Sequence, residues 1–204
     1  MKDTPRSQLG RIHSGRHQDV QFATGRGQES PQERARGGGP QSSSANLIVG
    51  IDPGLAGTGF ALLAEPNRVV ACGTVSTIPG REGPRLVAIA NHLRALIAEY
   101  HPAEASLEEL FMGRNATSAI GVAQARGVIL TVLEECDVPV FEYKPSQVKI
   151  VLTGYGKADK SQIQRMLAAQ VLLPAGKLDE HARDAIAIAV CHARSRKFNG
   201  SRPR

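Results

Sequence analysis

The sequence has no tryptophan, and aromatic residues make up only 4% of its 204 residues. It contains no run of about 18 apolar residues that would predict a membrane-spanning helix. Residues 1–30 contain no apolar segment typical of a signal peptide. Its three cysteines, Cys72, Cys136 and Cys191, form neither a CxxC pair nor a Cys/His zinc spacing. These absences argue against membrane proteins, disulfide-stabilised secreted domains and zinc fingers, so we expect a cytoplasmic protein with reduced, buried cysteines.

The composition indicates one globular domain, because 204 residues with 41% hydrophobic content suffice for a single core. A formal net charge of +6 suggests a polyanionic partner such as nucleic acid. Residues 1–45 hold seven Lys and Arg against four Asp and Glu, so half of this excess lies in one segment. Net charge is therefore only a hint of nucleic-acid binding.

The chain divides into three parts by composition. Residues 1–45 are rich in Gly, Ser, Gln, Arg and Pro and show no helical or strand periodicity, so we expect a disordered tail. Residues 46–195 have the patterning of a folded domain. Residues 196–204 are expected to form a short basic tail.

The folded part predicts an α/β domain with a five-stranded sheet of mixed direction and helices on both faces. Three consecutive strands suggest an antiparallel meander, and a fourth strand, reached through a helix, is expected to lie parallel to a neighbour. The expected strands are 46–52, 59–65, 68–77, 105–111 and 138–143. The expected helices are approximately 84–100, 118–136, 144–152, 160–172 and 179–195.

Acidic side chains stand where two of these strands end. Asp52 closes the first strand in GIDPG, and Glu108 lies near the end of the fourth in SLEELF. If the two strands are parallel neighbours, their carboxylates converge. On the last helix, His181 and Asp184 are three residues apart and share one face, while Asp179 precedes them as a helix cap.

Such a cluster predicts a divalent metal site, because unpaired buried carboxylates cost several kcal/mol. Oxygen ligands with one imidazole suit Mg²⁺, or Mn²⁺, and two ions per subunit support in-line phosphodiester hydrolysis. Each residue also has an ordinary alternative. Asp52 could cap the Pro53–Gly54 turn, Glu108 and His181 could be solvent-exposed, and Asp184 could favour the positive end of a helix.

Several motifs together resemble the RuvC family of Holliday-junction resolvases, in the ribonuclease-H-like superfamily. They are GIDPG, LEELFMGRNATSA, AQARG, VFEYKPSQVK, GYGKADKSQ and HARDAIAIA, and they span about residues 46–195. The resemblance implies that Asp52, Glu108 and Asp184 are catalytic metal ligands. His181 stands where many members have a fourth carboxylate, which leaves the metal affinity and pH profile open.

The resemblance also implies DNA contacts. Phe111 matches an aromatic residue that stacks near the crossover, although it could instead be core. The lysines could instead form a solvated face. The implied DNA-binding residues are Phe111, Arg114, Asn115, Lys149, Lys157 and Lys160.

What the family implies is a homodimer that cuts four-way DNA junctions by paired nicks, with a preference for short T-rich sites, alongside a branch-migration motor and junction-binding proteins. The small residues Ala119, Ala123 and Gly127 are the candidate dimer interface, unless they accommodate the domain's own sheet. Two rival hypotheses remain open. GIDPGLAGTG also resembles the phosphate loop of sugar-kinase or actin-like ATPases, and a relative with this fold could bind junctions without cutting them.

Overall fold

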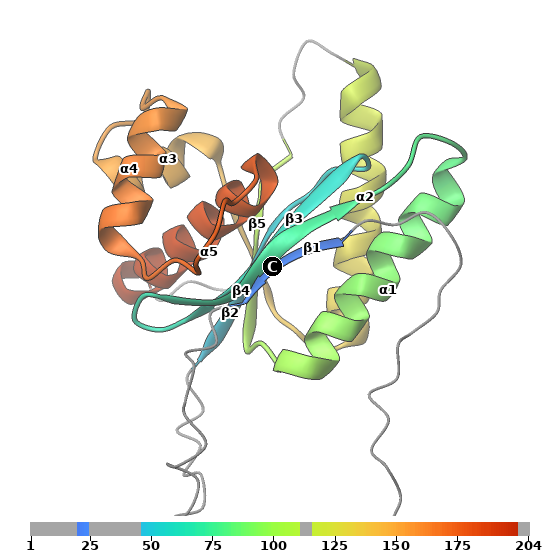
Figure 1. Cartoon of the computed structure of the whole chain (residues 1–204), viewed down its shortest axis with the longest axis horizontal. Helices are drawn as coiled ribbons and strands as arrows, with labels where there is room; N and C mark the ends of the chain where they lie inside the picture. Colours follow the sequence, from blue (N-terminus) through green and yellow to red (C-terminus); the bar gives the residue numbers. More distant parts are fainter. Residues whose placement is uncertain (1–19, 25–45, 111–115, 200–204) are drawn as a thin grey trace, which may run out of the picture.

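The structure, a computed structural model, describes residues 20–24, 46–110 and 116–199 (Figure 1). Six strands form one sheet: β1 (Val20–Thr24), β2 (Leu47–Asp52), β3 (Gly57–Ala64), β4 (Arg68–Ser76), β5 (Glu104–Glu108) and β6 (Val140–Tyr143). The helices are α1 (Glu82–Tyr100), α2 (Ala116–Glu135), α3 (Pro145–Thr153), α4 (Lys160–Gln170) and α5 (Glu180–Asn199). In the described part of the chain, no helix has the length and apolar character needed to cross a membrane.

The sheet is mixed, with the strand order β1-β4-β3-β2-β5-β6. Strands β2, β3 and β4 form the predicted antiparallel meander. Strand β5 lies parallel to β2, as predicted for a strand reached through the α1 crossover, and β6 lies parallel to β5. The mixed α/β architecture is confirmed, and the five predicted strands correspond to β2, β3, β4, β5 and β6, with helices on both faces.

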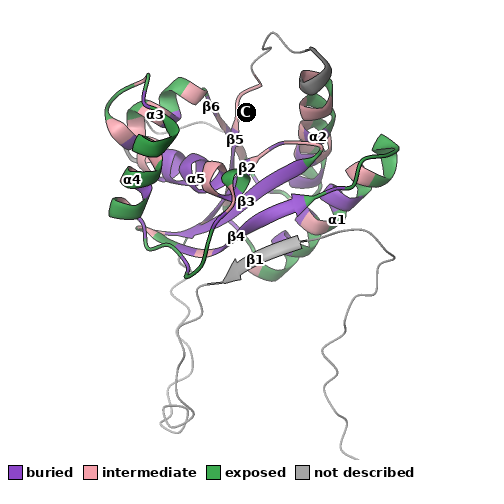
Figure 2. Ribbon diagram, turned by 45° about the horizontal axis from the view of Figure 1, so that its top comes forward, coloured by how far each residue is buried: buried purple, intermediate pink, exposed green. Residues whose placement is uncertain are grey.

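Two helical layers cover the sheet, and the alternation of its strands assigns side chains to each layer (Figures 1 and 2). On β2, Val49 and Ile51 pack with α1 and α2, whereas Ile48 packs with α5. The central strands are buried from both sides: every residue of β3 is buried. They therefore supply a rigid base for residues at their ends.

The sheet has one strand more than predicted. Residues 20–24 fall within the segment expected to be disordered, yet β1 pairs antiparallel with β4 from Val20↔Val75 to Thr24↔Ala71. The bias of residues 1–45 towards Gly, Ser and Arg hides this short strand, whose Val20, Phe22 and Thr24 are residue types common in strands and which pairs with the edge that β4 offers. The rest of residues 1–45 lies outside the described residues.

The last helix also runs further than predicted. Helix α5 continues to Asn199, so the predicted start of the basic tail at residue 196 is wrong. Arg196 is part of the helix and forms ion pairs with Glu65 and Glu104. These tertiary contacts extend a helix whose sequence had become polar.

A carboxylate cluster at the sheet edge

Asp52 and Glu108 lie side by side at one edge of the sheet. They are the last residues of β2 and β5, which are parallel neighbours with Ile51 opposite Leu107. Leu107 packs with the α1 and α2 layer, so the alternation of the strand places Glu108 on the α5 side. The predicted convergence of these two strand ends is confirmed.

Helix α5 approaches this edge closely because glycines line its path. A Cβ atom at Gly59 would lie 2.1 Å from the backbone oxygen of His181, and one at Gly50 would lie 2.2 Å from that of Ala185. A Cβ at Gly57 would lie 2.9 Å from Cδ2 of the His181 ring. These three glycines are not among the predicted site residues, although glycine inside a strand is a known signal of close backbone approach.

The first turn of α5 is fixed by Asp179. Its Oδ1 accepts hydrogen bonds from the backbone N–H of Ala182 at 2.8 Å and from Oγ1 of Thr74 at 2.6 Å. The predicted cap is confirmed, and Thr74 of β4 adds an anchor that the sequence did not reveal. Since His181 and Asp184 lie in the first turns of α5, this anchor sets their position over the sheet.

His181 contacts Asp52 directly. Its Nδ1 lies 2.8 Å from Oδ2 of Asp52, and the side chains are 47% and 17% exposed, respectively. The hydrogen bond to Asp52 is the main reason why the pKa of His181 is raised, against the lowering effect of burial. When protonated, the imidazole offsets part of the negative charge at this end of the sheet.

The other two carboxylates are poorly compensated. Burial, followed by the negative charges of Asp52 and Asp184, raises the pKa of Glu108 to about 7, and Lys149 opposes this effect. Burial and Asp52 also raise the pKa of Asp184, while Lys160 lowers it. Three carboxylates therefore influence one another in a space that favours a bound cation.

The donor types fit a hard divalent ion, since three carboxylates and one imidazole influence one another's charge at this end of the sheet. Within residues 46–110 and 116–199, however, no three acidic, imidazole or thiol groups already stand around a single point. Asp52 and His181 are in contact. Glu108 and Asp184 interact electrostatically with Asp52. The side chains are of the types that bind Mg²⁺ or Mn²⁺, but in this structure they do not form a complete coordination site.

Two of the predicted lysines border the cluster. Lys149 of α3 is half-buried and its charge acts on Glu108, while Lys160 begins α4 and bonds to Glu180 at an exposed position. Lys157 is exposed in the turn between α3 and α4. Phe111, Arg114 and Asn115, the other residues with implied DNA contacts, lie outside the described residues.

The α/β sheet, its helical layers and its acidic edge define a protein of the ribonuclease-H-like superfamily. The family model described as "Crossover junction endodeoxyribonuclease RuvC" matches residues 48–192. A relative with that name from Roseiflexus sp. (strain RS-1) is 46% identical over 153 residues, which are 73% of this chain and 91% of the relative. One from Desulfitobacterium hafniense (strain DSM 10664 / DCB-2) is 44% identical over 155 residues, covering 73% and 93%.

The fold comparison agrees. The structure titled "T. thermophilus RuvC in complex with Holliday junction substrate" matches with a TM-score of 0.72 and 29% identity, covering 78% of this chain and 99% of that one. This chain belongs to the RuvC family of crossover junction endodeoxyribonucleases. Membership decides against the ATPase hypothesis for the glycine-rich turn after Asp52.

Proposed function

We propose that this protein resolves four-way DNA junctions by metal-dependent hydrolysis of one phosphodiester bond in each of two strands of like polarity. The observation that carries the proposal is the convergence of Asp52, Glu108 and Asp184, with the pKa of Glu108 raised to about 7 by burial and its acidic neighbours. The family match supports the same substrate. Such an activity serves recombination and repair and belongs in the cytoplasm.

Asp52, Glu108, Asp184 and His181 would hold the metal, proposed as two Mg²⁺ or Mn²⁺ ions per subunit. When bound, such ions activate water and stabilise the leaving oxygen of the phosphodiester. The protein's own residues do the rest. Asp52 holds His181 in one orientation through Nδ1, and the Asp179 cap fixes the helix that carries His181 and Asp184.

The lysines at the rim are proposed to hold the DNA strand. Lys149 and Lys160 face Glu108 and Asp184, respectively, so phosphates bound by these ammonium groups would lie beside the cluster. Replacing either with Ala should weaken junction binding and reduce the salt slope of log K by about 0.9 per lost phosphate contact. An unchanged slope would mean that this lysine belongs to a solvated face and does not contact phosphate.

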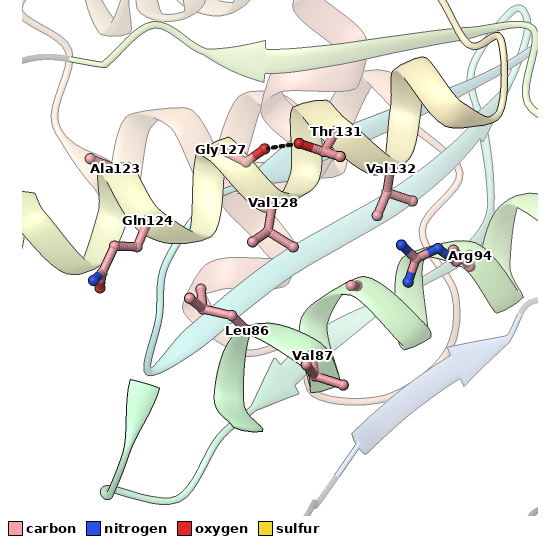
Figure 3. A pocket seen from close by; sticks show the side chains of 10 residues that line it. Leu86, Val87, Arg94, Ala123, Gln124, Gly127, Val128, Thr131 and Val132 are labelled. Atoms are coloured by element: carbon pink, nitrogen blue, oxygen red, sulfur yellow. Dashed lines mark hydrogen bonds between the residues drawn. The ribbon is translucent and has the colours of Figure 1, made fainter. Parts of the chain in front are cut away.

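Paired incision needs two active sites, and we place the dimer interface on the α1–α2 layer. A groove of about 510 Å³ runs between these helices, lined by Leu86, Val87, Ala123, Gly127 and Val128 among others (Figure 3). Val87 is 57% exposed, and apart from its chain neighbours and its own helix backbone, no described atom lies within 4 Å of where a Cβ of Gly127 would be. A second copy of the chain could bring its own α1–α2 layer against this apolar groove.

The small residues of α2 divide between the groove and the sheet. Ala123 and Gly127 are exposed and Ala119 is half-buried, whereas Ala125 is buried in the core. The alternative that small residues accommodate the domain's own sheet thus describes Ala125, and not Ala123 or Gly127. Ala123→Arg should give a folded monomer in sedimentation experiments that nicks a junction on one side at most. A dimer with paired incision would place the interface elsewhere.

The main test is cleavage of a labelled four-way junction, beside linear duplex and an RNA–DNA hybrid, with and without Mg²⁺ or Mn²⁺. Asp52→Asn, Glu108→Gln and Asp184→Asn should each lower the cleavage rate by on the order of 100-fold or more while junction binding persists. Glu99→Gln, the same chemical change on the exposed surface of α1, serves as the control. Junction binding without metal-dependent nicking by the wild type would favour a noncatalytic relative.

His181 can be tested separately because it stands where a carboxylate is common in the family. His181→Ala should impair cleavage, and His181→Asp should retain much of it by restoring an oxygen ligand. Equal loss in both variants would instead show that the imidazole ring has its own chemical role.

A further inference from the structure

Tyr155 is an unusual aromatic residue in this chain. The sequence contains only three Tyr, five Phe and no Trp. Among the aromatic side chains that the structure describes, Phe60, Phe141 and Tyr143 are buried, and Tyr100 is half-buried. Tyr155 is 57% exposed. Folding therefore leaves a large apolar ring in water at one particular place.

That place is the turn between α3 and α4, the two helices that carry the lysines beside the carboxylate cluster. Lys149 lies in the helix before the turn and acts on Glu108, while Lys160 begins the next helix and acts on Asp184 and Asp52. The turn thus joins two cations that face the proposed reaction centre. Figure 1 shows α3 and α4 together on the α5 side of the sheet.

The backbone of Tyr155 is held firmly. Oγ1 of Thr153 lies 3.1 Å from both the backbone N and the backbone O of Tyr155, and the N–H of Ala158 donates to the same oxygen at 3.1 Å. Gly154 ends α3 with φ at 76°, a left-handed conformation that favours glycine. A ring on a fixed backbone loses little further entropy when it binds a ligand.

Ile150 enlarges the exposed apolar surface beside the turn. It is 52% exposed, and its Cδ1 lies 3.4 Å from where a Cβ of Gly156 would be, so the isoleucine side chain covers the turn. An apolar surface carrying an aromatic ring between lysines has the composition of a single-strand binding site. In such sites, cations bind phosphates and rings stack on bases.

We infer that Tyr155 is a base-stacking residue, whose ring takes the face of a nucleobase unpaired next to the scissile phosphodiester. Lys149 and Lys160 would bind the phosphates on either side of that nucleotide. This inference rests on the proposed junction cleavage and adds a specific contact to it. Stacking accepts any base, so Tyr155 contributes affinity and opening of the strand more than sequence choice.

The test uses cleavage-inactive protein with the Asp52→Asn change, so that binding is measured apart from cutting. The probes are a four-way junction with 2-aminopurine beside the expected cleavage site and a short oligo(dT) strand. Tyr155→Ala should weaken oligo(dT) binding by about 5- to 100-fold, as expected for losing one base–aromatic stack. It should also remove the 2-aminopurine fluorescence change that accompanies junction binding.

Two further variants make the result specific. Tyr155→Phe keeps the ring and should bind within about twofold of the parent protein, since stacking needs no hydroxyl. Leu172→Ala removes an equally exposed apolar side chain, 61% exposed beside the start of β4, and should change neither signal. Unchanged binding in Tyr155→Ala, or equal loss in Tyr155→Phe, would overturn the inference.

Failure of this inference can be told apart from failure of the proposed function. Wild-type protein that nicks junctions with Mg²⁺, while Tyr155→Ala binds and cuts normally, would refute stacking alone. Normal DNA binding by Tyr155→Ala together with loss of a protein partner would assign the exposed ring to protein docking and likewise refute stacking. Thermal melting should be unchanged in every Tyr155 variant, since the ring is exposed.

Discussion

Charged side chains are arranged differently at the two ends of β5 and α5. We call the end with Glu104 the paired end and the end with Glu108 the reactive end. Glu104, at the start of β5, lies against His192 and Arg196 near the end of α5, and both of these side chains contact its carboxylate. Glu108, at the other end of the same strand, lies near Asp52 and Asp184 and has its pKa raised to about 7, chiefly by burial. Charge is thus paired within the protein at the Glu104 end, whereas at the Glu108 end acidic groups lie near one another where we propose that metal binds.

The paired end is a connected network around a fully buried imidazole. His192 Nε2 lies 2.9 Å from Glu104, and its Nδ1 lies 2.7 Å from the Tyr143 hydroxyl. A neutral ring satisfies both contacts, because Nε2 donates to the carboxylate while Nδ1 accepts from the tyrosine. Burial lowers the pKa of His192 despite the opposing effect of Glu104, which agrees with the neutral form.

The largest effect is expected from breaking the paired end. His192→Ala should lower the free energy of unfolding by about 3–5 kcal/mol, because it opens a cavity and leaves Glu104 and Tyr143 without the ring. Urea denaturation measures this. Arg194→Ala, a half-buried neighbour on α5, should cost about 1 kcal/mol or less. A similar cost for both variants would refute the importance of the network.

Removing a charge from the reactive end should raise the free energy of unfolding, whereas breaking the paired end lowers it. Glu108→Gln should stabilise the metal-free protein at pH 8 while cleavage is lost. A pKa raised from 4.5 to about 7 corresponds to about 3 kcal/mol by linkage, and solvent screening reduces our expectation to about 1–2 kcal/mol. Destabilisation by this substitution would mean that Glu108 is compensated in the folded state.

The two ends should also give opposite dependences on pH. The raised pKa of Glu108 gives stability that is present below pH 4.5 and is lost as pH rises towards 7. The lowered pKa of His192 gives stability that is present above about pH 6.5 and is lost below it, because the unfolded histidine takes up a proton. The lowered pKa of His92 gives a pH dependence of the same direction as that of His192. The raised pKa values of Asp184 and His181 give one of the same direction as that of Glu108.

Unfolding free energies measured from pH 5 to 8 test this contrast. Each proton difference contributes a slope of up to about 1.4 kcal/mol per pH unit. Glu108→Gln should reduce the fall in stability with rising pH, and His192→Gln should reduce the fall at acidic pH. Parallel pH curves for wild type and both variants would contradict the assignment.

The smallest effect is expected from the exposed ion pair at the reactive end. Lys160 and Glu180 are 67% and 62% exposed, so the pair resembles other surface pairs that contribute little to stability. Glu180→Gln should leave the urea midpoint unchanged. It should slightly strengthen junction binding at low salt by freeing Lys160, and this gain should vanish at high salt. A clear loss of stability would show that the pair fixes α4 to α5.

Much of the fold followed from local pattern. The apolar run before Asp52 predicted a buried strand with a carboxylate at its end, and the spacing of His181 and Asp184 predicted a shared helix face. The rule for crossover connections made β2 and β5 parallel, and so brought Asp52 and Glu108 to one edge. These features depend on strand and helix periods, which a sequence carries directly.

Only the tertiary structure decided the features that depend on a distant partner. Strand β1 exists as a strand because β4 offers an unpaired edge, and Arg196 belongs to α5 because Glu65 and Glu104 lie beside it. Gly59 is needed because the backbone of α5 passes over it. The sequence determined which charged residues lie at the two ends of β5 and α5, since residue identity and spacing within a strand or helix can be read from the sequence alone. Folding decided that Glu104 is paired and that Glu108 has no ion pair among the residues that the structure describes, because pairing depends on contacts between residues far apart in the chain.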